Sequence, residues 1–106
     1  MLEKAAVGVY NYYDLGGKDD MAFYFPTYKD NSFSSLNQTI DNSLYQTLIA
    51  NYNATSNPYL LVGNVSRPAI AQQIISLCRL RTSVGVSPGY TCVDMDALNL
   101  NSILLE

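Results

Sequence analysis

Carboxylates are the side chains of this sequence that are best suited to conventional chemistry. They form two candidate pairs, Asp19 with Asp20 and Asp94 with Asp96. Paired carboxylates can transfer protons or hold a hard cation, although a cation also needs further oxygen ligands. The sequence identifies no such ligands beside either pair. We therefore interpret the first pair as a solvated turn and the second as a solvent-facing strand end, and a carboxylate-based enzyme ranks third among our hypotheses.

The sequence contains no histidine among its 106 residues. Its absence removes the usual general base, the commonest metal ligand and the His-dependent Ser and Cys triads. Six Lys and Arg against nine Asp and Glu give a net charge of −3, and the basic residues are scattered along the chain. Nucleic acids and anionic membrane surfaces are disfavoured as partners, because they need a dense cationic face. We expect no catalytic residue, no metal and no cofactor.

The two cysteines, Cys78 and Cys92, are an even pair. A disulfide between them would close a loop of about 15 residues and stabilise the fold by ~3 kcal/mol in the chain-entropy model. Disulfides persist in oxidising compartments, whereas in a reducing cytosol the pair would be two small buried thiols. We expect the disulfide, and with it an extracytoplasmic location, periplasmic or secreted.

Tyrosine and arginine are the residues most suited to recognition. Tyr combines a large contact area with a polar tip, and the sequence holds nine of them, several in the first two expected strands. They form either an exposed recognition surface or the second face of a hairpin. The segment between the cysteines is either a tethered loop preorganised for an acidic or planar group, or a plain connection. The candidate binding residues are Tyr10, Tyr12, Tyr24, Arg79, Arg81 and Tyr90.

Alternating and apolar patterns predict the strands that position these residues. Residues 6–13 and 21–28 alternate and are separated by turn residues, which predicts a hairpin with Pro26 favouring a sheet edge. Residues 59–65 are nearly all apolar, as is typical of a central strand buried on both faces. Residues 90–95 predict another strand. Residues 98–105 are ambiguous between a short strand and a last helical turn.

Two helices are expected between the strands. Ser35 to Gln38 has the S-x-x-Q form of a capping box, and apolar residues at every fourth position follow it as far as Tyr52. A second helix is expected from Ser66, with Pro68 in its first turn, to about Thr82. The stripe on its expected buried face consists of Ile70, Ile74, Leu77, Cys78 and Arg81.

The expected order of elements is β-β-α-β-α-β in a single domain over residues 1–106. The simplest packing is an α+β two-layer sandwich, with two helices on one face of a mixed sheet. No apolar run approaches the roughly 18 residues of a membrane span, so we expect no membrane insertion of this segment. Leu105-Glu106 is the dipeptide that a cloning site commonly leaves, so we expect it and Met1 to be additions to an excised domain.

Elimination leaves an interaction role as the leading hypothesis. We expect a non-enzymatic extracytoplasmic protein-interaction domain, for example a subunit or module of a bacterial envelope, secretion or surface assembly. Its partner would be another protein, and self-association into a homo-oligomer is left open. The alternative is a small secreted inhibitor or immunity-type protein that binds and blocks a partner enzyme. Stacking of sugars on exposed Tyr is a further possibility.

Overall fold

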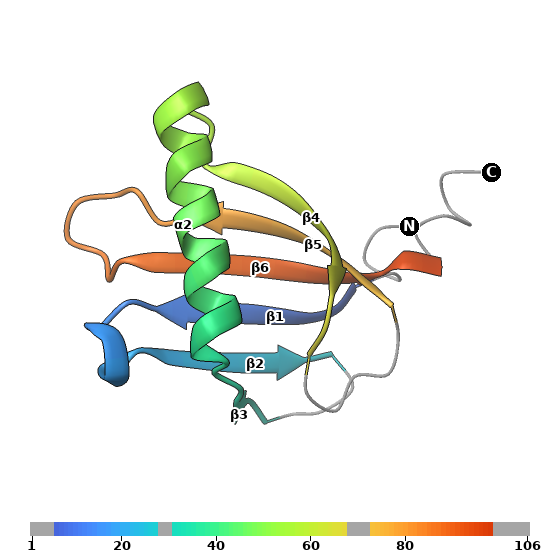
Figure 1. Ribbon diagram of the computed structural model, residues 1–106. Coiled ribbons are helices and arrows are strands. Elements are labelled where there is room, and N and C mark those ends of the chain that lie inside the picture. Colours follow the sequence, from blue (N-terminus) through green and yellow to red (C-terminus); the bar gives the residue numbers. More distant parts are fainter. Residues whose placement is uncertain (1–5, 28–30, 68–72, 99–106) are drawn as a thin grey trace.

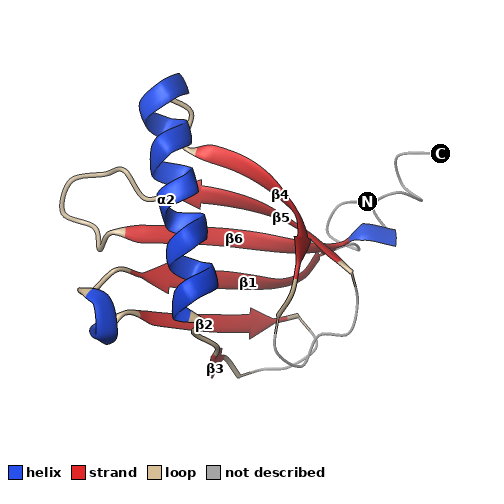
Figure 2. Cartoon of the chain, in the orientation of Figure 1, coloured by secondary structure: helices blue, strands red, loops and turns tan. Residues whose placement is uncertain are grey.

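The computed structural model describes residues 6–27, 31–67 and 73–98. In chain order the elements are β1 (Ala6–Tyr13), a 3-10 turn η1 (Gly17–Asp19), β2 (Met21–Pro26), β3 (Phe33–Ser34), α2 (Gln38–Thr55), β4 (Tyr59–Val65), β5 (Ile74–Leu80) and β6 (Gly89–Asp96). The strands form one sheet in the order β3-β2-β1-β6-β5-β4, and α2 lies across one of its faces (Figures 1 and 2). Met1, Pro68 and the dipeptide Leu105-Glu106 lie outside the described residues.

The expected α+β class is confirmed, but two finer predictions are wrong. Each strand pairs with its neighbours in the antiparallel sense, so the sheet is not mixed. Within the described part of the chain α2 is the only α-helix longer than a turn, so a sandwich with two helices is not found. Of the ambiguous end segment, the structure describes only Leu98, which lies in a helical turn with Ala97.

The prediction of a second helix is wrong because residues 74–80 form the strand β5. Ile74, Ser76, Cys78 and Leu80 are buried, whereas the residues between them are less buried, which is the period-two pattern of a strand. The same stretch also matches a helical stripe, and the sequence pattern alone does not separate the two periods. β5 pairs with β4 on one side and β6 on the other. A helix here would have left the backbone groups of both neighbours unpaired.

Strand β4 lies at the edge of the sheet, so the prediction of a central strand buried on both faces is wrong. The chain crosses from the end of α2 to this edge, and β4 pairs only with β5. Leu60 and Val62 pack towards the core beneath the helix, whereas Leu61 is 61% exposed on the opposite face. The apolar residues of this strand therefore contribute to both faces of the sheet, one of which is buried and the other open.

Helix α2 is the most securely predicted element, although its cap differs from the expected one. Asn37 is the N-cap, and its side chain accepts a hydrogen bond from the Ile40 amide at 3.2 Å. Ser35 precedes the helix and does not cap it. The buried residues of the helix are Asp41, Tyr45 and Leu48, which face the sheet. At the other end Ser56 adopts a left-handed conformation that closes the last turn.

Tyrosines dominate the core between α2 and the sheet. Tyr10, Tyr12, Tyr24 and Tyr90 are at most 1% exposed and contact Tyr45 and Leu48 of the helix or one another. The rings of Tyr12 and Tyr90 are stacked, with centroids 5.0 Å apart. Because a tyrosine ring is large and carries a hydroxyl group, this core needs polar partners at its periphery.

The disulfide between Cys78 and Cys92 is confirmed. The two residues are directly opposite each other on β5 and β6, with Cα atoms 4.0 Å apart, and both are fully buried beneath the helix. Side chains of an antiparallel pair approach most closely where the two residues are not hydrogen-bonded to each other. A buried disulfide in a domain of this size is compatible with an extracytoplasmic location.

Reduction of this disulfide is expected to lower the free energy of unfolding by ~3 kcal/mol, because the unfolded chain regains the entropy of an open loop. Urea unfolding with and without a thiol reductant measures the difference. A double variant, Cys78→Ala with Cys92→Ala, is the control and should not respond to the reductant. Equal unfolding midpoints for oxidised and reduced wild type would contradict the prediction.

Candidate functional site

Four of the six predicted binding residues lie in the core rather than on a surface. Tyr10, Tyr12, Tyr24 and Tyr90 point to the face of the sheet that α2 covers, where they are buried. Of the alternatives that the sequence left open, the exposed recognition surface is therefore wrong for these four residues. The alternation of the strands correctly separates two faces, but the helix decides which face is covered.

Arg81 holds the connection between β5 and β6 against β1. Its guanidinium donates hydrogen bonds to the Ser87 carbonyl oxygen at 2.9 Å, to Thr91 Oγ1 at 2.9 Å and to the carbonyl oxygen of Tyr12. It also lies over the Tyr13 ring, 4.6 Å from the centroid. Burial lowers the pKa of Arg81, and its nearby phenol groups oppose that shift. Its donors are largely used within the fold, so Arg81 has a structural role.

Gly89 allows this arrangement around Arg81. Its φ of 140° is a conformation that side chains rarely adopt, and a Cβ atom there would collide with the Tyr12 carbonyl oxygen and the Arg81 guanidinium. The start of β6 can therefore approach β1 and Arg81 closely only because this residue is glycine.

The face of the sheet opposite α2 carries an apolar row across five strands. Strand register places its members side by side, and four of the five are between 39% and 61% exposed. We call this set the open-face row: Phe25, Val9, Val93, Leu77 and Leu61. In the sequence these residues alternate with the buried residues of the same strands. The sequence does not show that the face they form is left uncovered.

Arg79 lies beside the open-face row. It is exposed, and its guanidinium carbon lies 5.5 Å from the centroid of the Tyr59 ring. Among the described residues it forms no ion pair, since the one ion pair there joins Arg67 to Asp94. Of the predicted binding residues, Arg79 is therefore the one whose charged group is available to a partner.

A polar cluster beneath the start of α2 connects the helix to the sheet. The hydroxyl of Tyr10 donates to the Asp41 carboxylate and lies 3.3 Å from the Ser35 carbonyl oxygen. Tyr90 donates to the Asp41 carbonyl oxygen at 3.2 Å. Burial, together with the Asp41 charge, raises the pKa of both tyrosines well above 10. Burial also raises the pKa of Asp41, although hydrogen bonds from Tyr10 and Asn37 oppose this shift.

Asp20 corrects our interpretation of the Asp19 and Asp20 pair as a solvated turn. Asp19 is exposed, but Asp20 is buried, accepts a hydrogen bond from the Tyr12 hydroxyl at 2.5 Å and accepts another from the Leu15 amide at 2.9 Å. Burial and then the hydrogen bond to Asp20 raise the pKa of Tyr12 to about 12. The carboxylate thus serves a core tyrosine.

Asp94 is likewise buried, so the prediction of a solvent-facing strand end is wrong for this residue. Arg67 donates two hydrogen bonds to it, from Nε at 2.7 Å and from Nη2 at 3.1 Å, and Ser76 donates a third. Burial alone would lower the pKa of Arg67, but the Asp94 partner outweighs it and raises the pKa. The sequence did hold a signal of this burial. Asp94 is two positions from Cys92 on the same strand, so it lies on the same face as the buried disulfide, and a carboxylate buried there needs a cation.

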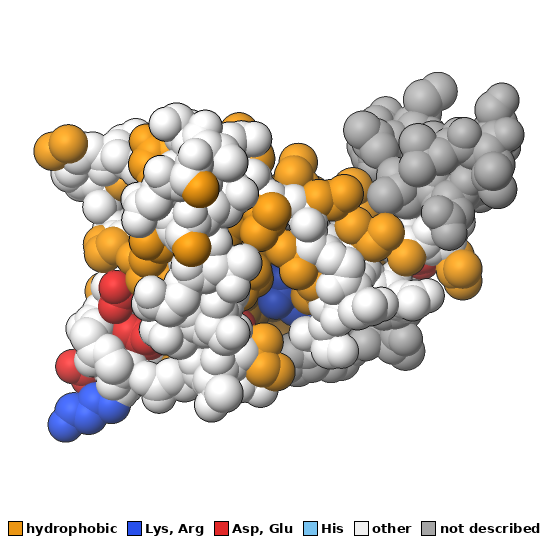
Figure 3. Space-filling model, turned by 45° about the horizontal axis from the view of Figure 1, so that its top comes forward, with side chains coloured by type: hydrophobic (Ala, Val, Ile, Leu, Met, Phe, Trp, Pro, Cys, Tyr) orange, Lys and Arg blue, Asp and Glu red, His pale blue; other side chains and the backbone are white. Residues whose placement is uncertain are grey.

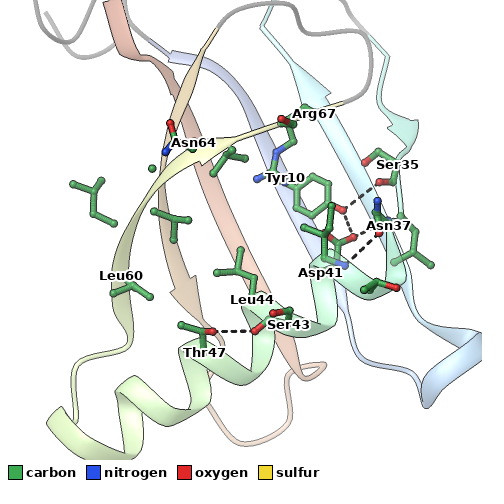
Figure 4. Close-up of a pocket in the computed structure, with 18 of the residues that line it drawn as sticks. Tyr10, Ser35, Asn37, Asp41, Ser43, Leu44, Thr47, Leu60, Asn64 and Arg67 are labelled. Carbon is green, nitrogen blue, oxygen red and sulfur yellow. Dashed lines mark hydrogen bonds between the residues drawn. The ribbon is translucent and has the colours of Figure 1, made fainter.

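A hollow beside the helix ends at Arg67, the cation of this pair. Its volume is about 1240 Å³, and it lies between the first half of α2 and strand β4. Figure 3 shows hydrophobic side chains around the hollow and a basic side chain at its floor. Figure 4 shows Tyr10, Arg67, Asp41, Ser35 and Asn37 gathered at one end. The sequence analysis did not predict this cavity, because its walls come from three segments that are far apart along the chain.

The described residues offer neither a metal centre nor a membrane helix. No group of three or more Cys, Asp or Glu side chains lies close enough to hold a metal ion in this part of the chain. Among these residues no helix has the length and apolar character needed to cross a bilayer. Searches against models of known families, curated proteins and solved structures found no significant match to this chain. Its function must therefore be argued from these surfaces.

Replacing Arg67 by Met is expected to lower the free energy of unfolding by about 3–5 kcal/mol, because it leaves the buried Asp94 carboxylate without its cation. Arg79→Met removes the same charged group from an exposed position and should change stability by less than about 0.5 kcal/mol. Urea unfolding of both variants provides the comparison. Similar stability for the two variants would show that the buried pair contributes nothing specific.

The core tyrosines predict a loss of stability at alkaline pH. In the unfolded chain they ionise near pH 10, whereas in the fold Tyr12 keeps its proton to about pH 12 and the pKa values of Tyr10 and Tyr90 are also raised. The stabilisation is therefore complete below pH 10 and is lost as the pH rises through the folded pKa values. Each retained proton contributes a slope of about 1.4 kcal/mol per pH unit.

Urea unfolding at several pH values above 9, followed by far-UV circular dichroism, measures this slope. The variant Tyr12→Phe removes one titrating group and is expected to make the slope shallower. An unfolding free energy that stays constant from pH 9 to pH 11, within about 0.5 kcal/mol, would contradict the prediction.

Proposed function

We propose that this chain is a non-enzymatic protein-interaction domain whose binding surface is the open face of the sheet. One observation carries the proposal. Phe25, Val93, Leu77 and Leu61, with Val9 among them, form a continuous apolar row that no described element covers. Exposed contiguous apolar surface of this kind marks interaction sites in folded domains.

The dimensions of the face suit a protein partner. Five strands spaced about 4.8 Å apart, each about 20 Å long, present roughly 500 Å² of projected area. A standard interface buries about 800 Å² of accessible surface on each partner. The accessible surface of a pleated face with projecting side chains is larger than its projected area, so this face approaches that size. The composition also agrees, since Phe, Met, Tyr and Arg are enriched at interfaces. On this face they are represented by Phe25, Met21, Tyr59 and Arg79.

Charge favours a different protein over a second copy of this chain. The row is flanked by the guanidinium groups of Arg79 and Arg81, neither of which forms an ion pair among the described residues. In a face-to-face dimer, the second copy would place its own arginines near this row, and its row contains no carboxylate to pair with Arg79. The complementary partner therefore presents an apolar surface with a carboxylate opposite Arg79.

The buried disulfide supports an extracytoplasmic location for this domain, because such bonds persist where thiols are not kept reduced. The bacterial envelope, a secretion system or a surface assembly is the setting that we propose. In that setting the domain would serve as a module that holds a partner rather than transforms it.

A second candidate function, a small secreted inhibitor, is favoured by the connection between β5 and β6. The disulfide at its base and the hydrogen bonds of Arg81 restrain it, and the Asp14 amide donates to the Pro88 carbonyl oxygen at 2.9 Å. At its tip Val84 is fully exposed. A restrained loop with a projecting apolar residue is preorganised to enter a cleft of another protein.

Photo-crosslinking separates the two functions. A photoreactive amino acid is placed at Leu61 on the open face, at Val84 on the loop, or at Leu15, an exposed control in the turn after β1. The experiment is done in cells that naturally produce the protein. We expect the Leu61 position to give an adduct with another protein, and Arg79→Glu to reduce that adduct at least about tenfold.

Three outcomes would overturn the proposal. A strong adduct only from Val84 would establish the inhibitor-type surface in its place. Adducts from Leu61 that contain only a second copy of this chain would make the face a self-association interface. Equal labelling from Leu61 and Leu15 would show that the face has no specific partner. Unchanged circular dichroism spectra and thermal melting of the Arg79→Glu variant serve as the control for folding.

A further inference from the structure

The cavity between α2 and β4 lies on the helix side of the sheet and has two unlike ends; of the open-face row, only Leu61 on the edge strand borders it. Leu44 of the helix and Leu60 and Val62 of the strand give it apolar walls. Its other end holds the polar cluster around Tyr10 and Asp41 (Figure 4). An apolar cavity with a few convergent polar groups is the usual form of a site for a small molecule.

The charges at the polar end do not balance. Asp94 is matched by Arg67, which donates both of its hydrogen bonds to that carboxylate. Asp41 is 2% exposed; burial raises its pKa and the charge of Arg67 opposes that rise, but no Lys or Arg among the described residues forms a direct ion pair with it. Buried charges are normally paired, because an isolated carboxylate loses its hydration without compensation. The cluster of two carboxylates and one guanidinium therefore lacks one positive charge.

The oxygen atoms around this cluster also have unused capacity. On Asp41, Oδ2 accepts from the Tyr10 hydroxyl and from the Asn37 amide at 3.0 Å, but Oδ1 has only a 3.5 Å contact with the Tyr90 hydroxyl. Ser35 lines the cavity and is only 8% exposed, and its buried hydroxyl has no hydrogen-bond partner among the described residues. The Tyr10 hydroxyl donates to Asp41 and lies 3.3 Å from the backbone carbonyl oxygen of Ser35, so the two residues lie on either side of one hydroxyl group.

We infer that this cavity binds a small organic cation, with a primary ammonium group at Asp41 and Ser35 and an apolar body against Leu44, Leu60 and Val62. An ammonium group has three donors and no acceptor, which matches a cluster of oxygen acceptors that lacks one positive charge. An anion is disfavoured, because the cation of the cluster is already engaged by Asp94 and the second carboxylate would repel it.

Three probes with the same apolar body test this inference: 3-methylbutylamine, 3-methylbutanol and 3-methylbutanoate. Each is titrated into the wild-type protein, and binding is followed by the NMR signals of the Leu and Val methyl groups. We expect the amine to bind with a Kd of about 1 mM or tighter and at least about tenfold more tightly than the alcohol. The shifted signals should be those of Leu44, Leu60 and Val62 rather than those of Leu77 and Val93.

Two charge variants complete the test. Asp41→Asn keeps the shape of the side chain and removes its charge, and it is expected to weaken amine binding at least about tenfold while alcohol binding is unchanged. Asp19→Asn removes the same charge from an exposed turn and should leave both affinities unchanged. Asp41 is not part of the open-face row, so in the absence of the amine this variant should leave the photo-crosslinks from Leu61 unchanged, and failure of the amine site is distinguishable from failure of the proposed function.

The wild-type titrations keep the inference falsifiable even if Asp41→Asn does not fold. Tighter binding of the carboxylate probe would overturn it and make Arg67 the anchor of an anion site. Equal affinity for all three probes would show that the cavity recognises only the apolar body. Shifts confined to Leu77 and Val93, or no binding of the amine, would also overturn it.

Discussion

Buried tyrosine hydroxyl groups constrain this structure more than any other interaction. The rings of Tyr10, Tyr12 and Tyr90 fill the space beneath α2, and each hydroxyl needs a hydrogen-bond partner there. Asp41 supplies partners from the first turn of the helix, and Asp20 supplies one from the turn before β2. These contacts fix where the helix begins and how it crosses the sheet. They also bring buried carboxylates into a small domain that has few cations to neutralise them.

One helix over a six-stranded sheet leaves the two faces with different roles. The covered face holds the disulfide, the tyrosine core and the cavity, whereas the opposite face shows apolar side chains such as Leu61 and Leu77 to the surroundings. An exposed apolar face is costly in water, which is why we attribute binding to it. The cavity adds a second surface with a different chemistry. Its carboxylate without a cation is the reason that we assign it a small charged ligand rather than a protein.

Several features followed directly from the sequence. The hairpin of β1 and β2, the helix α2 and the pairing of Cys78 with Cys92 are supported by local patterns or by simple counting, and the structure contains all three. The expected helix from Ser66 failed because residues 74–80 satisfy two periods at once. The choice between them depended on β4 and β6, which offered a strand more backbone hydrogen bonds than a helix could supply.

By itself, the sequence determined whether one or both faces of each strand carry apolar side chains. It also determined the lack of histidine chemistry and the even pair of cysteines, because all of these depend only on residue type and spacing. The tertiary structure alone decided which face of the sheet the helix covers. That decision buried Tyr10, Tyr12, Tyr24 and Tyr90, and it left Arg79 exposed. It also joined Arg67 to Asp94, which are 27 positions apart. Faces, charge pairs and cavities arise from contacts between distant segments, and a local pattern holds no information on which segments will meet.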